Sequence, residues 1–203
     1  MQQPLEWIEI RWHGRGGQGA VTASRILASA ALQHGLFFQS LPSFGAERSG
    51  APVMAFTRIS RHPITLRCQI MEPQVVVVLD HTLLQLASVL EGLGPEGVLL
   101  VNSPGDSEFL RRTMPDCPGQ IHTVDASRIA TETLGRHMPN TPMLGALIAV
   151  TGLVSLEACE QALGNLLPAR LGEKMRLANI EALRLGHAQV RSEGSLPLLG
   201  RIS

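Results

Sequence analysis

IEIRWHGRGGQGAVTA, residues 8–23, joins an alternating strand to a glycine-rich turn and a helix of small residues. Gly14, Gly16 and Gly19 fit the pattern G-x-G-x-x-G, and Gly17 adds a further glycine. Glycine permits a positive φ and close approach to the backbone, and the free N–H groups at a helix start attract anions. The stretch predicts a strand–turn–helix unit, for which dinucleotide binding is the first interpretation.

Two features argue against a dinucleotide site. A Rossmann fingerprint needs an acidic residue about 20 positions further on, after the second strand, to bind the ribose. The second strand is predicted over residues 36–41, and the first acid after it is Glu47, next to Arg48 in a glycine-containing loop. The first strand also alternates apolar and polar residues, whereas the first strand of a doubly wound sheet should be nearly all apolar.

Composition excludes several classes of protein. The chain has 203 residues and no net charge, so it lacks the basic surface expected of a protein that binds nucleic acid or an anionic membrane. Its three cysteines, Cys68, Cys117 and Cys159, form no C-x-x-C pair, so no iron–sulfur or zinc motif is present. The N-terminal sequence shows no secretory signal, and the longest apolar stretch, residues 143–156, is too short to span a bilayer. We expect a cytoplasmic protein.

Strands and helices are predicted to alternate, which favours an α/β fold. We expect strands at 53–59, 64–67, 75–79, 98–102 and 121–124, with the first two forming a hairpin, and helices at 18–34, 82–90 and 126–134. The last third is predicted to be helical, over 143–152, 156–163 and 170–185, with Gly186 ending the last helix. Residues 105–119 are predicted to be irregular. We expect one domain over residues 1–186 and an extended tail over 187–203 that buries its apolar residues on a partner.

Long segments of the chain resemble the gamma subunit of the pyruvate:ferredoxin and other 2-oxoacid:acceptor oxidoreductases. The matching segments are EIRWHGRGGQGAVTASRILA (9–28), PSFGAERSGAPVMAFTRIS (42–60), EPQVVVVLD (72–80), NTPMLGALIAVTGLVSLE (140–157) and ANIEALRLG (178–186). The spelling WHGRGGQG resembles the pyruvate type and also the gamma subunit of phenylglyoxylate dehydrogenases. The resemblance implies a three-layer α/β/α domain with a mixed, mostly parallel sheet.

The resemblance also implies a reaction, the oxidative decarboxylation of a 2-oxoacid with coenzyme A to an acyl-CoA, carbon dioxide and a reduced acceptor. Thiamine diphosphate with Mg²⁺ and iron–sulfur clusters carry that chemistry. This chain lacks a thiamine GDG motif, because its nearest match is Gly105-Asp106-Ser107, and it lacks cluster ligands. We therefore expect it to bind no cofactor or metal alone and to contribute no catalytic residue. Its expected partners are thiamine-binding alpha and beta subunits and a ferredoxin-like delta subunit.

Two loops carry the candidate site residues. The first holds Gly14, Arg15, Gly16, Gly17, Gln18 and Gly19, and the second, residues 42–52, holds Phe44, Glu47 and Arg48. We expect both loops to follow neighbouring strands and to form one surface facing the thiamine-binding subunits, with Phe44, Glu47 and Arg48 in the interface. Contact of the first loop or Arg48 with an anion such as a coenzyme A phosphate is the alternative.

Three further positions carry a structural and a functional interpretation. Asn140 or Thr141 is predicted to cap a helix with Pro142 at its first position, and an anion contact there is the alternative. His13 is predicted to be a hydrogen-bonded structural residue rather than a general acid–base. Asp80 is predicted to cap the helix that follows it rather than to bind a ligand. For the whole chain, a stand-alone nucleotide-binding or regulatory α/β protein is the competing hypothesis.

Overall fold

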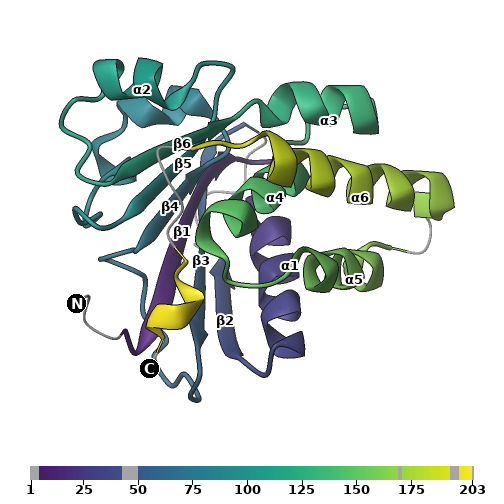
Figure 1. Ribbon diagram of the computed structural model, residues 1–203, viewed down its shortest axis with the longest axis horizontal. Helices are drawn as coiled ribbons and strands as arrows, with labels where there is room; N and C mark the ends of the chain where they lie inside the picture. The colour runs from purple at the N-terminus through teal and green to yellow at the C-terminus, as the bar shows by residue number, and fades with distance from the viewer. Residues whose placement is uncertain (1–4, 43–49, 169–170, 193–196, 203) are drawn as a thin grey trace.

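A mixed β-sheet forms the centre of the molecule (Figure 1). The computed structural model describes residues 5–42, 50–168, 171–192 and 197–202. The strands lie in the order β2 (Phe37–Pro42), β3 (Pro52–Ser60), β1 (Trp7–Arg15), β4 (Val75–Val78), β5 (Val98–Asn102), β6 (Gln120–Val124) and β7 (Arg191–Ser192). β1, β4, β5 and β6 are parallel, β3 is antiparallel to β1 and β2, and β7 is antiparallel to β6. This arrangement confirms the predicted α/β class with a mixed sheet.

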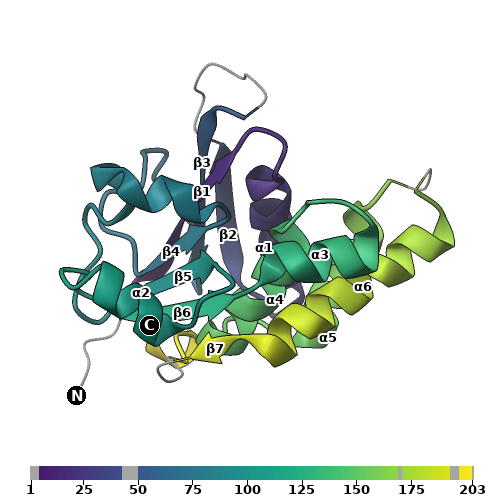
Figure 2. The same ribbon diagram turned by 90° about the horizontal axis from the view of Figure 1, so that it is seen from above.

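Long helices cover one face of the sheet, and the larger core lies beneath them (Figure 2). They are α1 (Ala20–Gln33), α3 (Ala126–Leu134), α4 (Asn140–Thr151), α5 (Leu156–Leu166) and α6 (Gly172–Gln189). α4 is buried on nearly every side, since eleven of its twelve residues are buried. A helix that is apolar all round belongs in the interior of a protein, which is why its sequence shows no polar face.

A thinner layer covers the other face. It consists of the 3₁₀ turns η1 (His81–Gln85) and η2 (Ala87–Val89) and the short helix α2 (Ser107–Thr113). The alternate residues of β4 and β5, among them Val76, Val78 and Leu99, point into this second, smaller core. The central strands are therefore buried on both faces, and the expected three-layer arrangement is confirmed.

Three local predictions were wrong. Residues 64–67 form no strand, and β3 pairs with β1 and β2 instead of forming the expected hairpin. The helix predicted over 82–90 is two 3₁₀ turns, separated at Leu86, whose backbone is extended at φ −86° and ψ 123°. Residues 105–119 include α2, which Asp106 caps by accepting a hydrogen bond from the Phe109 N–H. Short elements such as these depend on tertiary packing more than on sequence periodicity.

Gly186 does not end the last helix but lies inside α6, which continues to Gln189. A Cβ at Gly186 would overlap the carbonyl oxygen of Pro142, and one at Gly145 would overlap the carbonyl oxygen of Leu183. These two glycines therefore let the backbones of α4 and α6 come into direct contact.

The end of the chain packs on the domain itself. Leu198 is fully buried and Ile202 nearly so, both in the larger core, and Leu5 forms a β-bridge with Ile202. The expectation that these apolar residues need a partner was wrong, because the helix layer and the N-terminal segment already cover them. The division of the chain at residue 186 stays a prediction.

The two faces of β1 explain why apolar and polar residues alternate along it although it is a central strand. Ile8, Ile10 and Trp12 enter the larger core, and the residues between them face the thin layer. There the carboxylate of Glu9 accepts a hydrogen bond from the guanidinium of Arg58 at 2.6 Å, with both side chains largely buried. A buried charge is tolerated when it is paired in this way, so polar residues can line one face of a buried strand.

Candidate functional site at the carboxyl ends of β1, β4 and β5

The turn between β1 and α1 has the tight geometry that its glycines predict. The Gln18 side-chain oxygen accepts a hydrogen bond from the Arg15 N–H at 2.8 Å, and the Gln18 N–H donates to the Arg15 carbonyl at 3.0 Å. Gly17 and Gly19 have positive φ, of 98° and 83°. A Cβ at Gly19 would also lie 2.7 Å from Cγ of Asn140. Glycine at position 19 is thus required both by the backbone and by the neighbouring helix.

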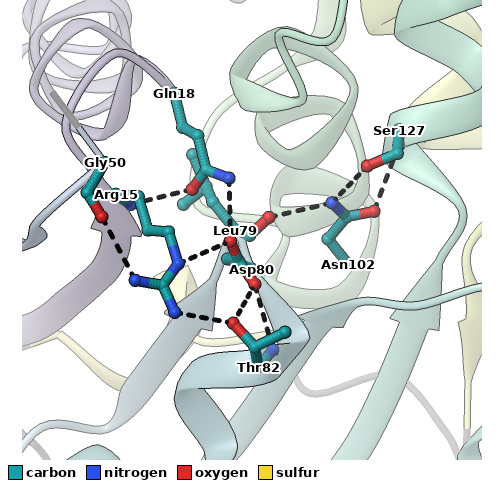
Figure 3. Close-up of polar contacts among 8 residues, drawn as sticks. All are labelled: Arg15, Gln18, Gly50, Leu79, Asp80, Thr82, Asn102 and Ser127. Carbon is teal, nitrogen blue, oxygen red and sulfur yellow. Dashed lines mark hydrogen bonds and ion pairs between the residues drawn. The ribbon is translucent and has the colours of Figure 1, made fainter.

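Asp80 follows β4 and connects the glycine turn to η1 (Figure 3). Its Oδ2 accepts hydrogen bonds from Arg15 Nε at 3.0 Å and from Gln18 Nε2 at 3.1 Å. Its Oδ1 accepts two from Thr82, from the backbone N–H at 3.0 Å and from the hydroxyl at 2.6 Å. A carboxylate has about four acceptor sites, so this one is fully used within the chain. The predicted capping role of Asp80 is confirmed, and its link to the turn is new.

The surroundings of Asp80 favour its charged form. Burial acts to raise the pKa of the carboxyl, but the hydrogen bonds from Thr82 and Gln18 and the charge of Arg15 outweigh it. The net effect is a pKa below the ordinary value for aspartate. Asp80 is therefore an anion at neutral pH, fixed between the turn and η1.

Arg15 is held by three segments and still reaches the surface. Besides Asp80, its guanidinium donates to the carbonyl of Gly50 at 3.1 Å and to the Thr82 hydroxyl at 2.9 Å (Figure 3). Its side chain keeps 35% of its area exposed. The sequence placed Arg15 in the loop, but only the fold supplies the partners that orient it.

The second candidate loop meets the first through its described end. The Gly16 N–H donates to the Ala51 carbonyl at 2.9 Å, and the Gly50 N–H donates to the Gly16 carbonyl at 3.1 Å. The reason differs from the one expected, because β3 separates β1 from β2. Since β3 is antiparallel to β1, its first residue, Pro52, lies opposite Arg15. Phe44, Glu47 and Arg48 lie outside the described residues.

A second polar link joins the ends of β4 and β5. The side-chain NH₂ of Asn102 donates to the Leu79 carbonyl and to the Ser127 hydroxyl, both at 2.8 Å, and its oxygen accepts from the Ser127 N–H at 3.1 Å (Figure 3). Sequence reasoning missed Thr82, Asn102 and Ser127. The signal was present, because polar residues that follow buried strands gather at the carboxyl edge of a parallel sheet.

The predicted cap of α4 was wrong. The N-cap is Pro139, no side chain caps the helix, and Asn140 is already helical. Pro142 lies in the first turn, where its missing N–H costs no hydrogen bond. The side chain of Asn140 is buried and packs against Gly19, so its role is to support the glycine turn.

His13 has the structural environment predicted for it. Its Nε2 accepts a hydrogen bond from Arg11 Nε at 3.1 Å, and the ring is almost completely buried. Burial, aided by the charge of Arg11, lowers the pKa of His13 to about 4. The imidazole is therefore neutral at physiological pH.

Within the described ranges, no group of three or more His, Cys, Asp or Glu side chains is arranged to hold a metal ion. The helices of the same ranges include none that is long and apolar enough to cross a membrane.

Comparison with known proteins gives consistent matches. Residues 9–189 match the family described as pyruvate ferredoxin/flavodoxin oxidoreductase. The chain is 47% identical over 186 residues to pyruvate synthase subunit PorC of Thermotoga maritima, covering 92% of this chain and 96% of the relative. It is 50% identical over 175 residues to the common gamma subunit of the pyruvate/ketoisovalerate oxidoreductases of Thermococcus kodakarensis, covering 86% and 95%. The crystal structure of pyruvate oxidoreductase subunit PORC from Thermotoga maritima superimposes with a TM-score of 0.82 at 44% identity, covering 93% of this chain and 99% of that one.

Proposed function

Because the chain belongs to the pyruvate ferredoxin/flavodoxin oxidoreductase family, we propose that its task is to dock on the catalytic subunits of such an enzyme and shape their site. The chain is a gamma subunit of a pyruvate or 2-oxoacid:ferredoxin oxidoreductase complex. The whole complex converts a 2-oxoacid and coenzyme A to an acyl-CoA, carbon dioxide and reduced acceptor. Thiamine diphosphate, Mg²⁺ and the iron–sulfur clusters are held by the alpha, beta and delta subunits.

One observation carries the docking proposal, the carboxylate of Asp80 with its four hydrogen bonds. Asp80 fixes the glycine turn and Arg15 at the carboxyl ends of the parallel strands, where ligands and partners of α/β proteins usually bind. A partly exposed arginine held in one orientation is a typical anchor of a protein interface. We therefore assign Arg15 and the turn Gly14–Gly19, together with Phe44, Glu47 and Arg48, to the surface that faces the thiamine-binding subunits.

A contact between this chain and a phosphate of coenzyme A is a secondary part of the proposal. Three of the five N–H groups of the Arg15 guanidinium donate within the chain, which leaves two N–H groups for a phosphate. Arg15 and Arg48 are therefore both candidates for a phosphate contact, since arginine matches phosphate geometry.

The choice of 2-oxoacid is assigned to other subunits. The Thermococcus relative is named as common to pyruvate and ketoisovalerate oxidoreductases, so one gamma subunit serves two substrates there. By that analogy, neither a pyruvate-like acid nor an arylglyoxylate requires a change in this chain.

The competing hypothesis, a stand-alone nucleotide-binding protein, has less support. Asp80 follows the parallel strand next to β1, as a ribose-binding acid would. Its four acceptor positions, however, are filled by Arg15, Gln18 and Thr82.

Co-expression with the catalytic subunits tests the docking surface. Arg15→Glu should reduce both co-purification and acyl-CoA formation, because it removes the positive charge at the proposed interface and places a second negative charge beside Asp80. The matched control is Arg184→Glu, which breaks an ion pair to Glu160 between α5 and α6. Equal effects of the two variants, or normal assembly of Arg15→Glu, would contradict the proposal.

A further inference from the structure

A small cavity lies beside the network of Asp80, between the end of β1, the start of β3 and the thin layer. Its volume is about 150 Å³, and its lining residues are His13, Pro52, Val53, Met54, Leu83, Leu86 and Ser88. An apolar cavity of about this volume holds one molecule of the size of benzene. The walls are mainly aliphatic, so the occupant must have an apolar body.

His13 supplies an unused hydrogen-bond donor to this cavity. The Nε of Arg11 can only donate, so the Nε2 that accepts its bond carries no proton. In a neutral imidazole the proton is then on Nδ1. Among the described residues His13 has no second hydrogen-bond partner, although its side chain is buried and lines the cavity. His13 Nδ1 is not among the fully buried polar atoms that lack a partner, so this donor is open to the cavity, where water or a ligand can accept its hydrogen bond.

The charge behind His13 decides which acceptor fits best. Arg11 is buried, and its other donors reach the carbonyls of Val89 and Glu91, not a carboxylate. The described residues offer it no ion pair within 4 Å, although the negative charge of Glu91 acts on Arg11 and offsets part of its positive charge. A buried cation of this kind makes the surrounding potential positive, which favours an anion over a neutral acceptor. The Ser88 hydroxyl, which also lines the cavity, is a second donor.

We infer that this cavity binds a small carboxylate group with a short apolar body, which accepts a hydrogen bond from Nδ1 of His13. The carboxylate comes either from a free short-chain acid or from an acidic side chain of another subunit. The inference is independent of the docking role proposed for Arg15 and the glycine turn.

Titration of the full chain with isobutyrate tests the binding of a carboxylate, with the neutral amide isobutyramide as the matched control. The side-chain ¹⁵N and ¹³C resonances of His13 report binding at this cavity directly. We expect a saturable shift with isobutyrate and binding of isobutyramide about 10-fold or more weaker, the difference expected for a charged acceptor. No saturable shift with isobutyrate, or equal binding of the amide, would overturn the inference.

Two substitutions separate a role of His13 from a general change of the cavity. His13→Asn keeps a donor near the position of Nδ1 and should retain binding, whereas His13→Gln keeps the acceptor for Arg11 and should lose it. Binding is followed for both through the methyl resonances of Met54 and Leu83, which line the same cavity. Unchanged isobutyrate binding in a folded His13→Gln variant would contradict the assignment.

The same titration in the assembled complex identifies the source of the carboxylate. If the complex binds isobutyrate as the isolated chain does, the natural ligand is a free acid. If the isolated chain binds it and the complex does not, a partner side chain already fills the cavity, which a crosslink from residue 88 in a Ser88→Cys variant would locate.

Discussion

The Nε of Arg15 donates a hydrogen bond to Oδ2 of Asp80 across 3.0 Å and so joins the ends of two parallel neighbouring strands, β1 and β4. The two residues are 65 positions apart in the sequence. Gln18 reinforces the pair, because its side chain contacts both. The shape of the glycine turn is thus fixed by a residue that follows another strand.

Asp80→Asn should destabilise the chain and loosen the turn. An amide cannot accept all four bonds, and an unsatisfied hydrogen bond to a charged group costs about 1.5–3 kcal/mol. Urea unfolding measures the loss of stability, and the backbone N–H of Gln18 should exchange its hydrogen with solvent faster. Glu173→Gln is the control, because its pair with Arg176 is exposed to solvent and contributes little to stability. Equal stability of the two variants would show that the hydrogen bonds of Asp80 do not stabilise the folded chain.

His13 should make stability depend on pH in a defined window. Its pKa is lowered from 6.5 to about 4, so between these values the unfolded chain binds a proton that the folded chain does not. The contribution of His13 to the free energy of unfolding is fully present above pH 6.5. It is lost as the pH falls towards 4, which lowers the free energy of unfolding by about 3 kcal/mol. Urea unfolding of the wild type and His13→Gln at several pH values should show a flatter profile for the variant.

His62→Gln is the control for that profile, since His62 is exposed. Its pH dependence should follow the wild type. Parallel profiles for wild type and His13→Gln between pH 4 and 6.5 would exclude a lowered pKa at His13.

Gly19→Ala should cost more stability than Gly17→Ala. Both residues have positive φ, which costs about 1–2 kcal/mol for alanine. Only at Gly19 would the new Cβ also clash with Asn140, which adds about 1–3 kcal/mol. Thermal unfolding measures both variants. In a double-mutant cycle, Asn140→Ala should recover part of the cost at Gly19 and none at Gly17, and purely additive effects would contradict the clash.

Leu198→Ala should destabilise the isolated chain. Leu198 is fully buried in the larger core, and its N–H donates to the Thr151 carbonyl at 2.8 Å. Loss of a buried leucine side chain costs about 2–5 kcal/mol, to be measured by urea unfolding of the chain without partners. Leu177→Ala, at an exposed position of α6, should change stability little. An unaffected Leu198→Ala chain would restore the view that the tail acts only on a partner.

Sequence patterns predicted the central elements well because local signals and tertiary environment agree there. β5 and α3 have the predicted bounds, and Asp125 caps α3 by accepting from the Arg128 N–H. Gly186 shows how a contact distant in sequence can overrule a local signal. Gly186 has the sequence signature of a helix end, yet it lies inside α6 because the backbone of Pro142 occupies the space of its Cβ.

The sequence by itself determined the α/β class, the glycine turn after the first strand and the family, because these depend on residues that are contiguous in the chain. Only the tertiary structure decided that Asp80 holds Arg15, that β3 brings Gly50 to Gly16, and that His13 lines a cavity in front of a buried Arg11. Each of these depends on strand order and on which residues face each other across the sheet. Burial then gives those contacts their energetic weight, and one sequence pattern is compatible with several strand orders.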